Sequence, residues 1–420
     1  MRKILSTFTL YFFVILFIIG WWALAFRQPT GSSSLFPDIA DHPIKNTKES
    51  LRASLSKLDR DHLQQALSGD FELMSQLITD WDIDAQMLTA AGIQGAKRLP
   101  THDFLQSHAL IRLMHTPSSE ETLKLSTDNF LIDDAGKRID LTRSYRRFLP
   151  QTYAAAAFLL AIAPVDQIIA LPRRMREQTQ LYRKALTDQI PLDIDRHNSE
   201  KLFQFRPEIA FVAHYSHPAT IQTLANQGVV LFTMKNLKTI HDITDELTRI
   251  GQIINRSQQA ELLKLFIEAA ILAIDNRQLL LITEIEKAQK PLPTILMINY
   301  HQYYSLPTQN TLTGQLLMRM GAFDMTSKYA SHHDDANEWM VPIDKERLIN
   351  LNPDYLIIAM DNQPALEKEI RNDNALKSLN AVRHDRLYFV DEAVHHSPSQ
   401  YIVLAYFDLL QVLANHLGQR

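Results

Sequence analysis

The chain has 420 residues, 46% of them apolar and 21% charged, which is the composition of a folded globular protein of roughly two or three domains. It contains no cysteine, which excludes disulfide scaffolds, Cys-ligated metal centres, a thiol nucleophile and a Cys-anchored lipoprotein. Its net charge of −4 gives no attraction to nucleic acid, and its 11 glycines form neither a Rossmann fingerprint nor a P-loop.

The first 25 residues carry the features of an export signal. Met1-Arg2-Lys3 is basic, residues 4–22 are uncharged, and Ala23-Leu24-Ala25 matches the small residues that signal peptidase accepts. The uncharged run of 19 residues is longer than a cleaved signal needs and could span a bilayer core of about 30 Å. We therefore predict a signal peptide or a membrane anchor over 1–25, followed by a linker over 26–46. Either one makes the protein periplasmic or otherwise extracytoplasmic, and it is soluble or tethered through the uncharged run.

The exported part begins with helical patterns and continues as alternating strands and helices. Leucines recur at helical spacing, which predicts a small α-helical extension over 47–127. Residues 129–142, NFLIDDAGKRIDLT, predict a hairpin around Asp134-Ala135-Gly136. Short apolar runs then alternate with helical stretches, and this alternation predicts parallel α/β units. The runs are FLP, QIIALP, EIAFVA, VVLFTM, TILMINY, YLIIAM and RLYFVD.

Two stretches of the chain repeat one pattern 146 residues apart. Residues 200–213 read EKLFQFRPEIAFVA and residues 346–359 read ERLINLNPDYLIIA. Each predicts a helix, a proline that ends it and a buried strand, so we expect two Rossmann-like lobes with parallel sheets, over 128–257 and 291–420. Residues 258–290 hold no glycine or proline across 33 positions, which predicts a single long helix that joins the lobes.

The order of these segments over residues 128–418 resembles the substrate-binding proteins of ABC importers, in the class that serves iron-siderophores, haem and cobalamin. The similar segments of the first half are NFLIDDAGKRIDLT, RRFLPQTYAAAAFLLAIAPVDQIIALP, NSEKLFQFRPEIAFVA and HPATIQTLANQGVVLFTMKNLKTIHDITDELTRIGQII. Those of the second half are DKERLINLNPDYLII and LNAVRHDRLYFVDEAVHHSPSQYIVLAYFDLLQVLANHL. The resemblance implies a protein without enzymatic activity and without a cofactor of its own. It would capture an iron chelate, haem or corrinoid between two lobes and deliver it to an ABC permease dimer with its ATPase.

Histidine, tyrosine and arginine residues follow several of the predicted strands. In open α/β sheets, ligands bind beyond the carboxyl ends of the strands. His and Tyr are ligands for ferric or haem iron, and Arg pairs with carboxylates. A single His or Tyr at a strand end is also typical of a hydrogen-bonded surface residue, but the recurrence favours a ligand site between the lobes, with Tyr215 and His301 in direct contact. The predicted ligand-binding residues are Tyr153, Arg173, Arg174, His214, Tyr215, His301, Tyr303, His395 and His396.

Two alternative functions remain open at the level of the sequence. A metal-dependent exported enzyme would use the His-rich loops, and a partner-binding module would keep the same two-lobed scaffold. The sequence has no G-x-S-x-G, no H-E-x-x-H and no nucleophile–base pair of recognisable spacing, which favours ligand capture. The run His332-His333-Asp334-Asp335 offers metal ligands but is more typical of a solvated loop, so metal binding stays undecided. We expect no nucleic-acid partner.

The resemblance also implies two docking carboxylates, one on each lobe, that meet arginines on the two permease subunits. The matching positions are Glu200 and Glu346, which open the two copies of the repeat. Each lies seven residues before its proline, at a predicted helix start where the helix dipole favours a carboxylate. The favourable interaction with the helix dipole is also sufficient to explain a Glu at this position without a docking partner. We expect both side chains to be exposed and dispensable for ligand binding.

Overall fold

A computed structural model describes most of the chain after residue 57. The described residues are 58–81, 129–179, 181–194, 204–321, 324–326, 329, 339–361 and 364–418. The predicted signal or anchor, the linker, Glu200 and the run 332–335 lie outside them. In the described part, no helix is both long and apolar enough to cross a membrane.

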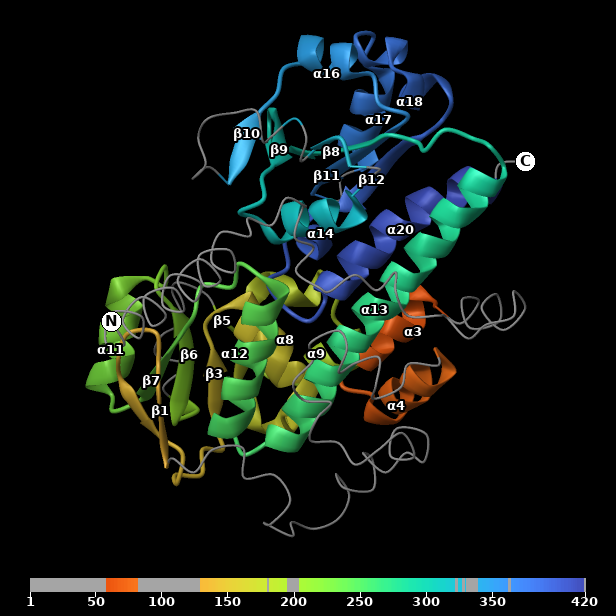
Figure 1. The fold of residues 1–420 in the computed structure, drawn as a ribbon. Coiled ribbons are helices and arrows are strands. Elements are labelled where there is room, and N and C mark those ends of the chain that lie inside the picture. The colour runs from red at the N-terminus through yellow and green to blue at the C-terminus, as the bar shows by residue number, and fades with distance from the viewer. Residues whose placement is uncertain are drawn as a thin grey trace, which may run out of the picture. The chain divides into compact units, whose positions relative to one another are not determined.

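The first sheet is parallel and occupies the N-terminal half of the chain (Figure 1). A parallel bridge between Phe148 and Ile168 links its three-stranded part to a two-stranded part, so the strands form one surface. Its strands are β3 (Phe148–Pro150), β6 (Ile209–Ala213), β7 (Val230–Met234), β4 (Ala170–Pro172) and β5 (Leu192–Ile194). Its helices are α8 (Tyr153–Ile162), η3 (Val165–Gln167), η4 (Arg173–Arg176), α9 (Lys184–Thr187), α11 (Pro218–Asn226) and α12 (Ile240–Ile253).

The predicted hairpin is confirmed and is attached to this sheet. Strands β1 (Phe130–Ile132) and β2 (Arg138–Asp140) pair antiparallel. The buried Asp133 accepts hydrogen bonds from the backbone N–H groups of Ala135, at 3.1 Å, and Lys137, at 2.7 Å. Its second oxygen accepts the N–H of Thr233 in β7 at 2.9 Å. One carboxylate thus closes the turn and fixes the hairpin to the sheet.

The second sheet is mixed and occupies the C-terminal half. Strands β8 (Ile295–Tyr300), β11 (Tyr355–Met360) and β12 (Leu387–Asp391) are parallel. Strands β9 (Tyr304–Pro307) and β10 (Met340–Pro342) extend the β8 edge antiparallel. All six residues of β11 are buried, as expected for a central strand covered on both faces. The helices are α14 (Leu312–Met320), α16 (Lys345–Leu351), α17 (Pro364–Asn372), η6 (Leu376–Ser378), α18 (Asn380–Arg383) and α19 (Glu392–His395).

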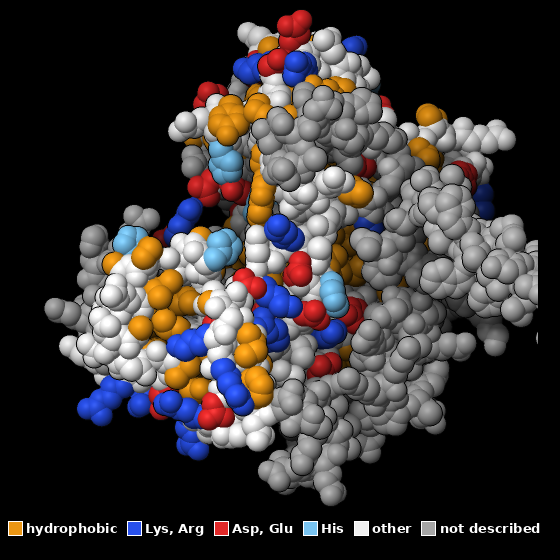
Figure 2. Space-filling view, turned by 60° about the vertical axis from the view of Figure 1, so that its left-hand side comes forward, with side chains coloured by type: hydrophobic (Ala, Val, Ile, Leu, Met, Phe, Trp, Pro, Cys, Tyr) orange, Lys and Arg blue, Asp and Glu red, His pale blue; other side chains and the backbone are white. Residues whose placement is uncertain are grey.

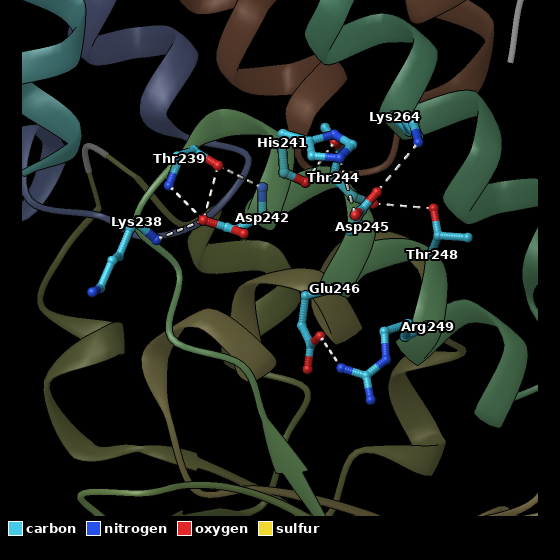
Figure 3. A network of polar contacts seen from close by, with 10 residues as sticks. All are labelled: Lys238, Thr239, His241, Asp242, Thr244, Asp245, Glu246, Thr248, Arg249 and Lys264. Carbon is cyan, nitrogen blue, oxygen red and sulfur yellow. Dashed lines mark hydrogen bonds and ion pairs between the residues drawn. The ribbon is translucent and has the colours of Figure 1, made fainter. Parts of the chain in front are cut away.

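A long helix, α13 (Ser257–Lys287), connects the two sheets near the stretch for which the sequence predicts it. Helix α12 packs against its first half, and both are tied at the surface: Lys264 of α13 lies 3.7 Å from the carboxylate of Asp245 on α12 (Figure 3). The C-terminal helix α20 (Ile402–Gly418) runs beside α13 (Figure 1). Two helices of the extension, α3 (Arg60–Leu67) and α4 (Phe71–Asp80), also pack against α13. The α/β class with parallel sheets is therefore confirmed.

The internal repeat is also present in the three-dimensional structure. Arg206 and Asn352 occupy the same place in the two copies, and both have left-handed backbone conformations, with φ of 49° and 42°. Each is followed by proline and a buried strand of its sheet. Glu208 and Asp354, again at matching places, accept backbone N–H bonds from the residues that precede the neighbouring strands, Arg146 and Thr294. The two halves are thus built by the same local rules.

Candidate functional site

Charged and histidine side chains gather where strands of the two sheets end. Figure 2 shows histidine, acidic and basic side chains close together at the left centre of one face. Arg174, His301, Asp361 and Glu392 follow β4, β8, β11 and β12, and the carboxyl ends of parallel strands lie at one edge of a sheet. Strands β8, β11 and β12 are neighbours in one sheet, whereas β4 belongs to the other. Residues far apart in the chain therefore meet partly through the topology of one sheet and partly through the packing of the two halves.

An ion pair joins the loops of the two sheets. The Arg174 guanidinium, in η4 directly after β4, lies 3.3 and 3.4 Å from the two carboxylate oxygens of Asp361, the first residue after β11. Both side chains are more than half exposed, at 59% and 56%. An exposed pair of this kind contributes only about 0–1 kcal/mol to stability. A carboxylate from a ligand can therefore replace Asp361 on Arg174 at little energetic cost.

A second polar pair lies on the C-terminal half, at the carboxyl end of its sheet. His301 follows β8 at the tip of the β8–β9 hairpin, and its Nε2 lies 2.9 Å from Oε1 of Glu392, the first residue of α19. Partial burial raises the pKa of the Glu392 carboxyl, the charge of His301 opposes that shift, and the nearby Asp361 adds to it. This effect of Asp361 connects the second pair electrostatically to the first.

His396 lies beside these pairs on the same sheet. Its Nε2 is 3.1 Å from Oδ1 of Asn299, a buried residue of β8. Burial lowers the pKa of His396 to about 4, and the charge of His301 contributes to the decrease. The imidazole is therefore neutral at pH 7. Because its Nε2 faces an amide oxygen, that nitrogen carries the proton and donates.

Tyr153 belongs to the N-terminal half of the site, where it follows β3. It is the first residue of α8, whose N-cap Thr152 accepts a hydrogen bond from the N–H of Ala155 at 3.1 Å. The side chain is 39% exposed. Partial burial raises the pKa of its phenol, and the charge of Arg174 opposes this shift, so the hydroxyl is protonated at neutral pH. Tyr153, Arg174, Asp361, Glu392 and His301 are thus linked by contacts or by electrostatic interaction.

Four other predicted residues are exposed but lie after other strands or beside the pairs. His214 and Tyr215 follow β6, and their rings meet edge to face with centroids 5.1 Å apart. Tyr215 is 68% exposed and Tyr303, at the tip of the β8–β9 hairpin, is 61% exposed. Arg173 is exposed next to Arg174. All four are accessible for binding.

The structure corrects the placement of His395. This side chain is completely buried, and its Nε2 lies 3.9 Å from a carboxylate oxygen of Asp408 in α20. Burial lowers the pKa of His395 to about 3, with smaller contributions from His396 and Arg60, so the ring is neutral. Adjacent residues of a helix turn point in different directions, and here His396 faces the site while His395 faces the interior. His395 is therefore not available to a ligand.

Two carboxylates of the site are missing from the sequence prediction. Asp361 follows YLIIAM and Glu392 follows RLYFVD, so the strand-end rule selects both. Acidic residues carry little information on their own, because a chain with 47 of them offers one near almost every strand. Among the described residues, no group of three or more His, Asp and Glu side chains is arranged to hold a metal ion.

The comparisons with known proteins agree with this architecture. No curated protein matches the sequence. Among solved structures, the triscatecholate siderophore binding protein FeuA from Bacillus subtilis, complexed with ferri-bacillibactin, matches at a TM-score of 0.51 with 16% identity, over 70% of this chain and 99% of that chain. The periplasmic heme-binding protein RhuT from a Roseiflexus species matches at 0.51 with 16% identity, over 65% and 99%. The molybdate periplasmic binding protein MolA from Haemophilus influenzae matches at 0.51 with 15% identity, over 69% and 92%.

These likenesses, all below 25% identity, establish the fold. A match to a protein family comes from the sequence itself: the family described as periplasmic binding protein matches residues 152–394, which is more than half of the chain. The matched range runs from the start of α8 into α19 and holds every strand of the two sheets except β3, together with Tyr153, Arg174, His301, Asp361 and Glu392 of the charged site. The chain therefore belongs to the periplasmic binding protein family.

Proposed function

We propose that this protein is the substrate-binding component of an ABC import system and captures an iron chelate, haem or corrinoid at the ends of its two sheets. The observation that carries the proposal is the Arg174–Asp361 pair, which brings the strand ends of both sheets to one place. Family membership supports an extracytoplasmic binding role, and the siderophore and haem binding proteins among its structural relatives support the ligand class.

The site offers two kinds of group for such a ligand. Arg174, freed from Asp361, would pair with a carboxylate or another anionic group, because a guanidinium forms two parallel hydrogen bonds with it. His301 and the exposed tyrosines, Tyr215 and Tyr303, supply nitrogen and oxygen donors suited to ferric iron. The transported chelate brings the metal, so the protein needs to recognise the chelate as a whole.

A binding titration of the purified full-length protein tests this proposal. Ferric haem is followed by its visible absorption, and a ferric catecholate siderophore and cobalamin are followed by quenching of tryptophan fluorescence. We expect saturable one-to-one binding of one of these three classes without turnover. Chemical conversion of the bound compound would support the metal-dependent enzyme, and no binding of any class would reject capture of an iron chelate, haem or corrinoid.

Substitutions at the charged pairs make the test specific. His301→Ala and Arg174→Ala should each weaken binding by about tenfold, because each removes a charged or coordinating group from the site. The matched control is His384→Ala. His384 is equally exposed on the same half of the chain, but it precedes β12 and so lies at the amino end of the sheet. Equal losses in His301→Ala and His384→Ala would place the site elsewhere.

Delivery to a permease dimer with its ATPase is the second part of the proposal. Glu346 is exposed in the first turn of α16, after the N-cap Asp344, as a docking carboxylate requires. Glu200 lies outside the described residues, so its proposed role rests on the family resemblance and on its matching place in the repeat. We further propose that residues 1–25 either are cleaved or tether the protein to the outer side of the cytoplasmic membrane.

A further inference from the structure

Helices α3 and α4 lie outside the residues matched by the family, which begin at residue 152. We call residues 58–81, which contain both helices, the brace. The brace is built into the protein: Leu63, Leu67, Met74 and Ile78 are completely buried, and the Trp81 ring stacks on Phe266 of α13 with centroids 5.6 Å apart. An element buried to this degree contributes to the packing of whatever it touches.

One set of contacts joins the brace to the segment that follows Glu392 and His396. The hydroxyl of Ser68 donates to the carbonyl of Gln64 at 2.7 Å, so it accepts from the hydroxyl of Tyr401 at 3.0 Å. The amide of Gln400 donates to the carbonyl of Leu67 at 3.2 Å. Further along, the Arg60 guanidinium lies 2.9 Å from the carboxylate of Asp408 in α20. The brace therefore holds the chain directly after α19.

A second set of contacts joins the brace to the other side of the site. Gly69, with φ of +97°, packs so closely on the end of α8 that an added Cβ would lie 2.3 Å from the carbonyl oxygen of Ala161. The amide of Gln64 donates to the carbonyl of Thr179 at 3.1 Å, five residues after Arg174. Gln400 also donates to the carbonyl of Ala157 in α8 at 2.8 Å. Helix α8 begins at Tyr153, so both N-terminal site residues lie on segments that the brace contacts.

We infer that the brace is a positioning element of the ligand site. It contacts the segments that carry Tyr153 and Arg174 and the segment that follows Glu392 and His396, and it thereby sets the spacing between the two sides. A binding site loses affinity when its supporting shell lets the contacting groups move apart. The inference rests on the proposed function, because that function makes the charged residues a ligand site. The distance between the two sides of the site can be measured without ligand.

Gly69→Ala provides the test, because its methyl group pushes the brace away from α8. The chain has no cysteine, so Gln222→Cys on α11 and Lys368→Cys on α17, both exposed, can carry spin labels as the only thiols. In the full chain without ligand, we expect a narrow distance distribution between the labels for the parent and a broadened or longer one for Gly69→Ala. Ferric haem affinity should fall by about tenfold in the same variant.

Gly228→Ala is the matched control. Gly228 also has a left-handed backbone, with φ of +75°, but an added Cβ would meet no atom within 4 Å. Both variants place a Cβ on a left-handed backbone, and only Gly69→Ala also brings it against α8. Unchanged distances in Gly69→Ala, or equal changes in both variants, would overturn the inference. Changed distances with unchanged haem affinity would also overturn it, because the brace would then support the fold without positioning the site.

Ser68→Ala is a milder second variant in case Gly69→Ala does not fold. It removes the acceptor for the buried Tyr401 hydroxyl and adds no atom. We expect a smaller broadening of the distance distribution and a smaller loss of haem affinity than in Gly69→Ala. A distance distribution and an affinity that both equal those of the parent would count against the inference. If the parent protein binds neither haem, nor a ferric siderophore, nor cobalamin, the proposed function fails, and the ligand-free distances still decide whether the brace holds the two sides.

Discussion

His395 and His396 show how differently two neighbouring residues can be used. His396 reaches Asn299 at the site, whereas His395 is buried next to Asp408. Both follow the same predicted strand, so the strand-end rule could not separate them. The same rule did select Arg174 and His301, which the structure places in charged pairs. The sequence gives the position of each histidine along the chain. The direction of each side chain depends on the helical turn after β12, which is seen only in the folded protein.

Glu268 on α13 is a buried carboxyl with an unusual titration. Burial raises its pKa to about 7; Lys264 opposes the shift, and Glu261 and Asp245 add to it. Lys264 is directed toward Asp245 (Figure 3), and within the described part of the chain one carboxylate oxygen of Glu268 has no hydrogen-bond donor. The unfolded chain has a Glu pKa near 4.5. The folded state therefore binds this proton more tightly than the unfolded chain does. The contribution of Glu268 to the free energy of unfolding is fully present below pH 4.5 and is lost as the pH rises through 7.

Glu268→Gln should stabilise the protein at pH 8 and have little effect at pH 5. The neutral amide avoids the cost of ionising a buried carboxyl, which is on the order of 1–3 kcal/mol at pH 8. Urea unfolding of both proteins at the two pH values measures the difference. Glu284→Gln is the control, because Glu284 lies on the same helix, is 42% exposed and pairs with Lys287. A gain of equal size at pH 5 and pH 8 would contradict the assignment of the raised pKa to Glu268.

The repeated helix–proline–strand unit is formed by interactions between residues that are close in the sequence. Pro207 and Pro353 end the preceding turn, and buried β6 and β11 follow. These features were readable from the sequence because they depend on neighbouring residues. Strands β5, β9 and β10 were not predicted, since each is only three or four residues long and is stabilised by pairing with a distant or antiparallel neighbour.

Arg206→Gly should stabilise the protein by about 0.5–1 kcal/mol. Arg206 holds a left-handed backbone with φ of 49°, which is unfavourable for a residue with a Cβ and natural for glycine. Asn352→Gly is the comparison at the matching position. There the Asn352 side chain accepts the N–H of Asn380 at 2.8 Å, so the loss of this bond offsets the relief of strain. Thermal unfolding should show a higher midpoint for Arg206→Gly alone, and a lower one would refute the strain argument.

The chain passes between its two sheets through α13, returns to the first half at Gln400, and then runs beside α13 again as α20 (Figure 1). Helix α20 packs beside α13, and Gln400, just before it, donates to α8 of the first sheet. The C-terminal helix therefore adds a second connection between the halves, parallel to the single helix that the sequence predicts. Together with the brace, this packing favours small movements of the two halves on ligand binding.

The docking carboxylates yield a prediction about the protein in the cell. Replacing Glu200 and Glu346 together with Ala should leave ligand affinity unchanged and abolish uptake, because in the proposed docking role these two separated charges would orient the protein on a basic permease rim. Uptake of the labelled ligand is measured in cells that lack the native chain. Glu369→Ala, at another exposed glutamate of the C-terminal half, should transport normally. Normal uptake by the double variant would rule out this docking assignment.

The α/β class, the repeated units, the long helix and most of the residues at strand ends can be read from the amino-acid sequence alone. These features follow from periodicity, proline positions and local charge, which act over a few residues. Three features are visible only in the folded protein: Arg174 meets Asp361, 187 residues away, Glu392 lies beside His301, and the brace contacts both sides of the site. The physical reason is that such pairs form when sheets and helices pack, and no local pattern records which distant segments will become neighbours.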